Sequence, residues 1–210
     1  MRVEWLSHAS VLVEGRLRMY IDPFEVSGEP ADVVFVSHSH RDHLDLDSLR
    51  SLVHAGTHIV CSADAHSKLA KLEPASITMM RPGDSASVAG VSVRATPAYN
   101  TDKPFHPKEN EWIGFLIEVE GVRIFFSGDL DDLPELEGLS CDLLFVPVSG
   151  TYVMTAEEAA RFSRRIVYRR VVPVHFGSII GTVEDAERFV SLVENAVVPK
   201  IGLDLLEGLR

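Results

Sequence analysis

The first third of the chain alternates apolar and polar residues over short stretches that end in polar or glycine-containing breaks. Alternation with a period of two is typical of half-buried strands, so these stretches predict strands. They cover residues 3–7, 10–14, 16–22 and 32–37. The pattern indicates a β-meander that leads into a buried strand, "DVVFVS".

The middle of the chain changes to helical spacing. Leu46, Leu49, Leu52 and Val53 recur at that spacing before Gly56, and they predict a helix within residues 44–56. A strand at 58–62 and a helix at 63–72 follow. Further strands are expected at 76–81, 91–97, 113–120 and 122–128.

The last part alternates strands, at 142–149 and 171–177, with helices, at 155–166 and 183–196. Thr155 and Thr182 stand just before acidic residues, as the N-cap residues of helices do. The fold class expected from the whole pattern is mixed α/β (α+β), with sheets covered by helices.

Composition supports one folded unit. The chain has 210 residues, of which 46% are hydrophobic and 24% charged, and no linker or repeat divides it, so we expect a single domain over 1–210. The one long irregular stretch, residues 97–112, has three prolines and predicts a surface loop. Loops of this length in compact domains often carry function.

Acidic residues outnumber basic ones by 31 to 20, which gives a formal net charge of −11. Such a field repels nucleic acid and anionic membranes, but a local metal site can still attract a small anion. Cys61 and Cys141 form no CxxC pair, and the N-terminus has no signal-peptide pattern. We therefore expect a cytoplasmic protein with a small-molecule substrate and no nucleic-acid or membrane partner. Assembly into a homo-oligomer is left open.

The candidate metal-binding residues are concentrated in "FVSHSHRDHL", residues 35–44, at the end of a predicted strand. Imidazoles and carboxylates are favoured ligands of first-row metals. In an extended segment His38 and His40 point the same way and can share one ion. Asp42 and His43 can face a second position as the chain turns into the next helix. One loop can thus serve two metals.

These residues resemble the HxHxDH signature of the metallo-β-lactamase superfamily. The resemblance spans nearly the whole chain. "WLSHASVLVEGRLRMYIDPF" (5–24) is similar to the opening of the ascorbate-phosphate-lactonase-like branch of metal-dependent hydrolases, "FFSGDLDDLPEL" (125–136) to the segment with the bridging aspartate, and "VVPVHFGS" (171–178) to the one with the last histidine. It implies a four-layer αββα sandwich with the metal centre at one edge.

The same resemblance implies a ligand set for two divalent ions. His38 and His40 belong to one ion, and Asp129 bridges the two. The other ion takes Asp42, His43 and His175. Zn²⁺ is favoured, with Mn²⁺ or iron as alternatives.

One position departs from the superfamily pattern. Most members have a further histidine for the first ion, where Asn100 stands in this chain. Three alternatives follow: Asn100 binds weakly through its carbonyl oxygen, His106 reaches in from the same loop, or the first ion is held loosely. His106 could instead line the substrate pocket.

Three further residues match the branch or lie near the expected centre. His8 is expected to face the pocket as a substrate-binding or proton-handling group, and it joins Asp42 as a candidate catalytic residue. Asp22 is expected to orient ligating histidines from behind. Tyr152 is a candidate substrate contact, although a packed aromatic is an equal alternative.

The expected function is metal-dependent hydrolysis of a small ester, lactone or phosphodiester by a metal-bound hydroxide. Redox chemistry with two irons is disfavoured, because the relatives that use it usually carry an acidic residue where His40 stands. The competing hypothesis is a non-catalytic metal-binding or ligand-sensing domain of the same fold, and Asn100 is the best argument for it.

Overall fold

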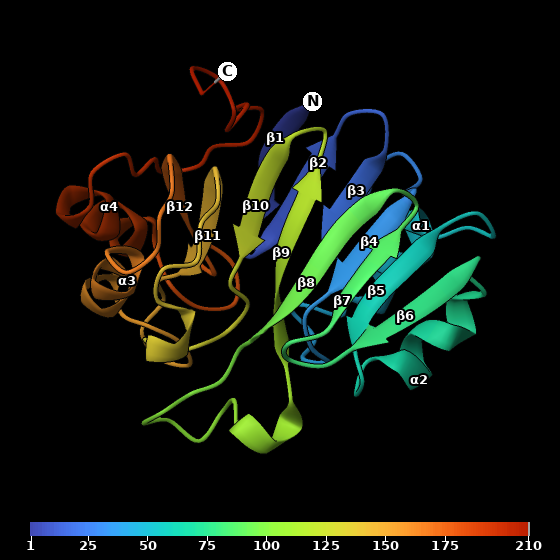
Figure 1. Ribbon diagram of the computed structural model, residues 1–210, viewed down its shortest axis with the longest axis horizontal. Helices are drawn as coiled ribbons and strands as arrows, with labels where there is room; N and C mark the ends of the chain where they lie inside the picture. Colours follow the sequence, from blue (N-terminus) through green and yellow to red (C-terminus); the bar gives the residue numbers. More distant parts are fainter. Residues whose placement is uncertain (210) are drawn as a thin grey trace.

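The computed structural model describes residues 1–209, which form two six-stranded sheets (Figure 1). The first sheet holds its strands in chain order: β1 (Arg2–Ser7), β2 (Ser10–Glu14), β3 (Arg18–Ile21), β4 (Val33–Val36), β5 (His58–Ser62) and β6 (Ser76–Met80). The second sheet has the order β12-β11-β10-β9-β8-β7. Its strands are β7 (Ser85–Val88), β8 (Val91–Pro97), β9 (Ile113–Val119), β10 (Val122–Phe126), β11 (Leu143–Pro147) and β12 (Arg170–Val174).

Each sheet begins with antiparallel strands and ends with parallel ones. β1, β2 and β3 pair antiparallel, whereas the pairs from β3 to β6 are parallel. In the second sheet β7 to β10 pair antiparallel, and β10, β11 and β12 pair parallel. Parallel strands have their carboxyl ends at one edge of a sheet, where loops can bring side chains together.

Helices cover the two outer faces. They are α1 (Leu46–Leu52), α2 (His66–Leu69), α3 (Ala156–Ser163) and α4 (Val183–Leu192), with 3₁₀ turns η1 (Ala70–Leu72), η2 (Lys108–Asn110) and η3 (Pro134–Leu136). Figure 1 shows α3 and α4 beside β11 and β12, and α1 and α2 beside the other sheet. The structure confirms the αββα arrangement.

Three apolar clusters hold these layers together. The central one joins the inner faces of both sheets, where the rings of Phe35 and Phe115 pack with centroids 5.3 Å apart. A second cluster joins the outer face of β10–β12 to α3 and α4, and a third joins β4 and β5 to α1 and α2. Burial of apolar area on this scale is the main favourable term in folding.

Most predicted elements are present, with local differences. Thr155 and Thr182 both form capping boxes, which confirms the starts of α3 and α4. The helix predicted at 63–72 is present as α2 followed by η1; its start has no side-chain cap, and Glu73 ends η1 in a left-handed conformation. β7 was not expected, since "SASV" has too little apolar alternation to indicate a strand.

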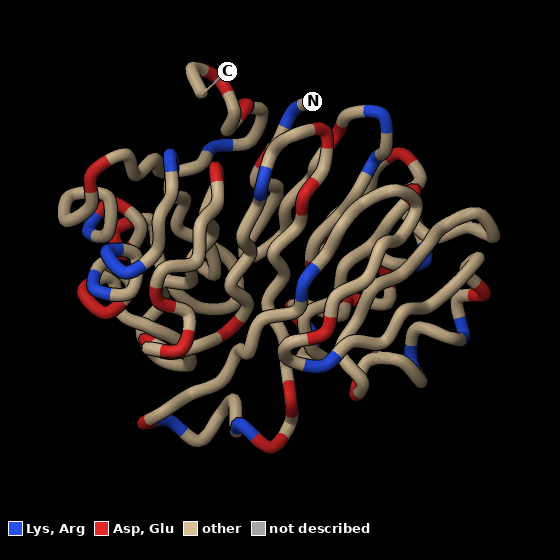
Figure 2. Tube along the Cα trace, viewed as in Figure 1, with Lys and Arg blue, Asp and Glu red and all other residues tan. Residues whose placement is uncertain are grey.

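The loop between β8 and β9 extends past the strand ends (Figure 1). Figure 2 shows Lys and Arg interspersed with Asp and Glu along the chain rather than gathered in one basic stripe. Within residues 1–209, no helix has both the length and the apolar character needed to cross a bilayer.

Candidate metal centre

The candidate site lies where strands of both sheets end. β4 ends at Val36, and the histidine cluster follows at once. In the second sheet Asp129 lies three residues after the end of β10, and His175 directly follows β12. Neighbouring segments after strand ends are thus brought together, as in other α/β sites.

A tight turn follows β4 within the histidine cluster. The backbone amides of His43 and Leu44 both donate to the carbonyl oxygen of His40, at 3.1 and 2.8 Å. Asp45 then caps α1 by accepting from the amides of Asp47 and Ser48. The turn and the cap hold the histidines in a fixed relation to α1.

Asp129 is at the centre of the cluster. Its Oδ2 lies 3.2 Å from His43 Nε2, 3.1 Å from His106 Nε2 and 3.1 Å from His175 Nε2. His38 Nε2 lies further away, at 3.9 Å. The aspartate is 4% exposed. One carboxylate oxygen therefore faces four imidazoles, which come from three segments of the chain: the HxHxDH segment, the loop with His106 and the end of β12.

Among residues 1–209, three sets of potential ligand atoms converge here. Within each set the atoms lie within 4.8 Å of one another: His38, His40 and His106; His8, Asp42 and His175; His38, His43 and Asp129. Around the second set, Asp42 Oδ2 also lies 3.3 Å from His175 Nε2 and 3.5 Å from His43 Nε2. The structure thus brings together His38, His40, Asp42, His43, Asp129, His175 and His106.

The ring nitrogens that point into the cluster fit divalent cations. Within residues 1–209, Nε2 of His43 and Nε2 of His106 are buried and make no hydrogen bond, although both lie near Asp129. Buried polar atoms are rarely left without a partner, because this costs free energy. Neutral imidazole nitrogens and carboxylate oxygens are the donors that zinc and its neighbours prefer.

The opposite ring nitrogens are held from behind. His38 Nδ1 lies 2.9 Å from Ser37 Oγ, and His175 Nδ1 lies 2.9 Å from Ser149 Oγ. His43 Nδ1 lies 2.7 Å from Asp22 Oδ2. Contacts of this kind fix the ring orientation and tautomer of a metal-ligating histidine.

Asp22 lies behind His43, where the sequence predicts an orienting residue. It is fully buried, and its carboxylate also accepts hydrogen bonds from the amide of Ser37 at 2.7 Å and from its hydroxyl at 2.5 Å. Burial raises the pKa of Asp22, and the contact with His43 opposes that rise. Asp22 thereby connects Ser37, at the start of the HxHxDH segment, to His43 at its end.

At the irregular position, the side chains of His106 and Asn100 lie differently relative to the cluster. His106 Nε2 points into the cluster, whereas Asn100 belongs to none of the three sets. The carbonyl oxygen of Asn100 accepts from the backbone amide of His106 at 2.9 Å and lies 3.0 Å from its Nδ1. Asn100 therefore supports His106 and does not offer its oxygen to the cluster.

His8 takes a different position from the expected one. It is 1% exposed and does not line the cavity over the cluster; its Nε2 lies 3.2 Å from Asp42 Oδ2. Its ring packs 4.2 Å from that of His175. His8 lies in the turn between β1 and β2 with a positive φ of 40°, and its ring belongs to the same set as Asp42 and His175. Tyr152 does line the cavity.

Burial and neighbouring charges shift the pKa values of the cluster residues in different directions. Burial, helped by the charge of His43, lowers the pKa of His38 well below its ordinary value. Burial also opposes charge on His175, but Asp129 and Asp42 outweigh it and raise that pKa to about 9. The carboxyl of Asp129 is buried too, yet His175 and His43 hold its pKa well below the usual range. The carboxylates thus require nearby positive charge, which divalent cations can supply.

Sequence reasoning did not find three supporting residues. Ser37 and Ser149 hold imidazoles, as described above. Trp112 packs its ring 4.6 Å from those of His38 and His40 and donates from Nε1 to Asp64 Oδ2 at 2.7 Å. The position of Ser37 next to HxHxDH was the one available signal; nothing in the sequence connects Ser149 or Trp112 to the cluster.

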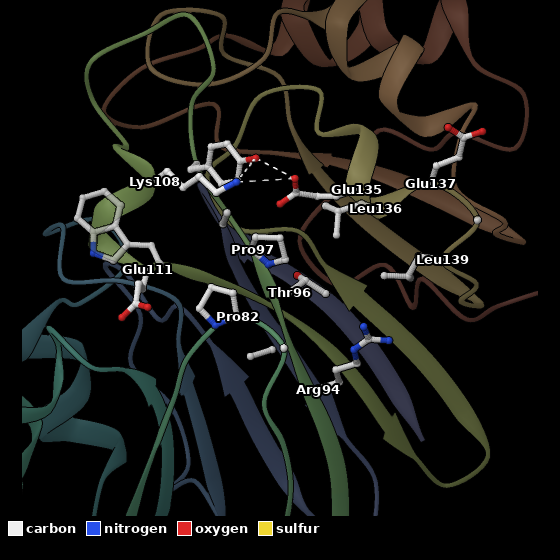
Figure 3. Close-up of a pocket in the computed structure, with 16 residues that line it drawn as sticks. Pro82, Arg94, Thr96, Pro97, Lys108, Glu111, Glu135, Leu136, Glu137 and Leu139 are labelled. Atoms are coloured by element: carbon white, nitrogen blue, oxygen red, sulfur yellow. Dashed lines mark hydrogen bonds and ion pairs between the residues drawn. The ribbon is translucent and has the colours of Figure 1, made fainter.

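A cavity of about 370 Å³ opens onto the cluster. It is lined by His40, Asp42, Phe105, His106, Asp129, Tyr152, His175 and Ile179. A larger depression of about 650 Å³ lies on the outer face of the second sheet (Figure 3). There Lys108 Nζ and Glu135 both contact the hydroxyl of Tyr99, at 3.1 and 2.9 Å. None of the predicted metal or catalytic residues lines it, so the smaller cavity is the candidate active site.

Known proteins resemble the chain over nearly its full length. A metal-dependent hydrolase of the UPF0173 group from Thermococcus onnurineus is 28% identical over 207 residues, which cover 91% of this chain and 92% of that protein. A crystal structure from Parabacteroides distasonis has a TM-score of 0.82 at 23% identity and covers 94% of this chain and 91% of its own. Igni18, a metallo hydrolase from Ignicoccus hospitalis, has a TM-score of 0.76 at 20% identity, with 96% of each chain covered.

The family model described as a beta-lactamase superfamily domain matches residues 9–176. Apart from His8, this range contains every residue of the three sets, from the HxHxDH segment to His175. The chain therefore belongs to the metallo-β-lactamase superfamily.

Proposed function

We propose that this protein is a hydrolase that holds two divalent cations and cleaves a small ester, lactone or phosphodiester. The observation that carries the proposal is the position of Asp129 Oδ2, which faces the Nε2 atoms of His43, His106 and His175 at 3.1–3.2 Å. A carboxylate in that position is suited to bridge two ions. The names of the relatives from Thermococcus onnurineus and Ignicoccus hospitalis support metal dependence.

The geometry supports a division of the ligands. His38, His40 and His106 would hold the first ion. Asp42, His43 and His175 would hold the second, with Asp129 between them. Zn²⁺ suits this mixture of imidazole and carboxylate donors, and Mn²⁺ or iron is the alternative.

When bound, two such cations would supply Lewis-acid chemistry that makes water a competent nucleophile near neutral pH and polarises the bond under attack. The residues of the chain would hold the ions and orient the groups that handle protons. Asp42 lines the cavity, and its Oδ2 lies 3.2 Å from His8 Nε2, where it can accept a hydrogen bond from that ring nitrogen. The pair is therefore our candidate for proton handling, with His8 acting through Asp42 and not on substrate directly.

The competing hypothesis is a metal-binding or ligand-sensing domain without turnover. Its best argument was the gap left by Asn100. His106 lies with His38 and His40 in the first set and would supply an imidazole at that place, which supports the hydrolase over this alternative. The resemblance to the ascorbate-phosphate-lactonase-like branch keeps lactones among the candidate substrates, and His40 supports hydrolysis over iron redox chemistry.

The test is hydrolysis of an aryl ester, a lactone and bis(4-nitrophenyl) phosphate by the full chain loaded with Zn²⁺. We expect turnover of at least one, its loss with a chelator, and a fall of about 100-fold or more in Asp129→Asn. His66→Ala changes a histidine of α2 that belongs to none of the three ligand sets, and it is the matched control. Turnover that survives both the chelator and Asp129→Asn would refute the proposal.

A further inference from the structure

The cavity over the cluster has an apolar mouth built by three loops. Phe105 comes from the loop between β8 and β9, Tyr152 from the loop after β11, and Ile179 from the segment between β12 and α4. The rings of Phe105 and Tyr152 meet edge to face, with centroids 4.6 Å apart and planes at 84°. Phe105 is 41% exposed and Ile179 54% exposed, so both present apolar surface to an incoming molecule.

The position of this mouth is fixed by the support of the histidine cluster. The side-chain amide of Asn100 donates to the carbonyl oxygen of Tyr152 at 3.1 Å, while its carbonyl oxygen holds His106. Phe105 is the neighbour of His106 in the chain. The apolar wall and the imidazole thus share one anchor, and the wall has a defined place relative to the reacting centre.

Within residues 1–209, neither lysine nor arginine lines this cavity. Two cationic residues close to the lining residues in the sequence, Lys103 and Arg41, lie elsewhere. Lys103 Nζ donates to Asp131 Oδ1 at 2.6 Å and to Asp102 Oδ1 at 2.8 Å. Arg41 lies in the HxHxDH segment but lines a separate depression together with Asp45. A second anionic group on a substrate would find no cationic partner at the mouth.

Resting on the proposed hydrolase function, we propose that the substrate is a neutral ester or lactone whose apolar substituent packs against Phe105, Tyr152 and Ile179. Small-molecule pockets are about 300–1,000 Å³, and this cavity of about 370 Å³ is near the lower limit. An anionic tail would leave water for an apolar wall without a compensating charge, which is unfavourable.

The reaction needs no further reactant. Water adds its hydroxyl to the carbonyl carbon and its remaining proton to the departing alkoxide, as the acyl C–O bond breaks. The products are a carboxylic acid and an alcohol, and for a lactone both groups stay in one molecule. The apolar wall therefore determines which substituent is accepted, while the cluster acts on the carbonyl group.

A matched pair of substrates tests the inference on the Zn²⁺-loaded full chain. 4-Nitrophenyl hexanoate ends in a methyl group, and mono-4-nitrophenyl adipate has the same number of carbons but ends in a carboxylate. We expect kcat/KM to be about tenfold or more higher for the hexanoate ester, because a hydrophobic pocket discriminates on this scale. Equal values, or a preference for the adipate ester or for bis(4-nitrophenyl) phosphate, would overturn the inference.

Substitutions at the mouth locate the preference. Phe105→Ala should raise KM for the hexanoate ester about tenfold. Ile179→Lys should shift the ratio of the two esters about fivefold toward adipate, through a partly exposed ion pair. Ile201→Lys makes the same change of charge at a residue that is 78% exposed and outside the cavity, and it should leave the ratio unchanged. A ratio that is the same in both lysine variants would refute the role of the mouth.

Binding distinguishes this inference from the proposed function. Calorimetric titration of the loaded protein with hexanoate and with adipate requires no turnover. Tighter binding of hexanoate together with no hydrolysis of either ester would support the apolar site and refute the hydrolase. Hydrolysis with a preference for the adipate ester would support the hydrolase and refute the apolar site.

Discussion

Replacement of Asn100 by alanine should weaken one of the two metal sites and leave the other nearly unchanged. Asn100 is buried, and its carbonyl oxygen receives the amide of His106 at 2.9 Å and faces Nδ1 of that residue at 3.0 Å. Without this oxygen the imidazole of His106 loses its fixed orientation. The backbone amide of His106 also loses its hydrogen-bond acceptor.

The size of the effect on metal affinity follows from these two contacts, and the effect on stability follows from all the hydrogen bonds of the Asn100 side chain. Loss of a partner that orients a ligating histidine typically weakens metal affinity about 10–100-fold, which corresponds to about 1.4–2.7 kcal/mol. The substitution also removes the donations of the Asn100 side-chain amide to Asp131 Oδ1 and to the carbonyl oxygen of Tyr152, at 3.1 Å each. Four hydrogen bonds lost at about 0.5–1.5 kcal/mol each would lower the free energy of unfolding by about 2–6 kcal/mol. Both effects should therefore be measurable in a protein that still folds.

The assay is a Zn²⁺ titration against a chromophoric chelator, which gives the number of sites and the affinity of each. Asn110→Ala is the matched control, because Asn110 lies in the same loop at the exposed end of η2. We expect Asn110→Ala to bind as the original chain does. If Asn100→Ala bound two ions with unchanged affinities while folded, the assignment of His106 to the first ion would be wrong.

The remaining predictions concern stability and reactivity. Asp22→Ala leaves His43 Nδ1 and the amide and hydroxyl of Ser37 without their acceptor. Denaturant unfolding should therefore show a free energy of unfolding lower by about 3 kcal/mol. A decrease below about 1 kcal/mol would contradict the supporting role of Asp22. Burial raises the pKa of Cys61 and of Cys141 to about 12, so a thiol reagent at pH 8 should label neither in the folded chain and both after denaturation. Fast labelling of the folded chain would contradict this. Thr155→Ala removes the cap of α3 and should cost about 1 kcal/mol; an unchanged unfolding midpoint would show that the cap is not stabilising.

The layers of the fold could be predicted because local patterns and packing agree. The Thr155 and Thr182 caps stand before apolar residues at helical spacing, and the structure has α3 and α4 at these places. β7 could not be predicted, because Ser85 and Ser87 face away from the core and its pairing with β8, not its own composition, makes it a strand. Tertiary pairing of this kind leaves little trace in a short segment.

The site could be predicted in part for a similar reason. His38, His40, Asp42 and His43 are close in sequence, so any compact turn brings them together. The choice between Asn100 and His106 depends on the path of an irregular loop, which hydrophobic periodicity does not encode. The burial of His8 depends on a single left-handed residue between two strands, and this too has no periodic signal.

The most direct test of the central claim is the metal content of the purified full chain, determined by elemental mass spectrometry before and after incubation with Zn²⁺ and removal of the excess. The account predicts close to two divalent ions per chain after incubation, and close to one in His106→Ala. At most one ion per original chain, or two ions retained in His106→Ala, would contradict a dinuclear centre completed by this histidine.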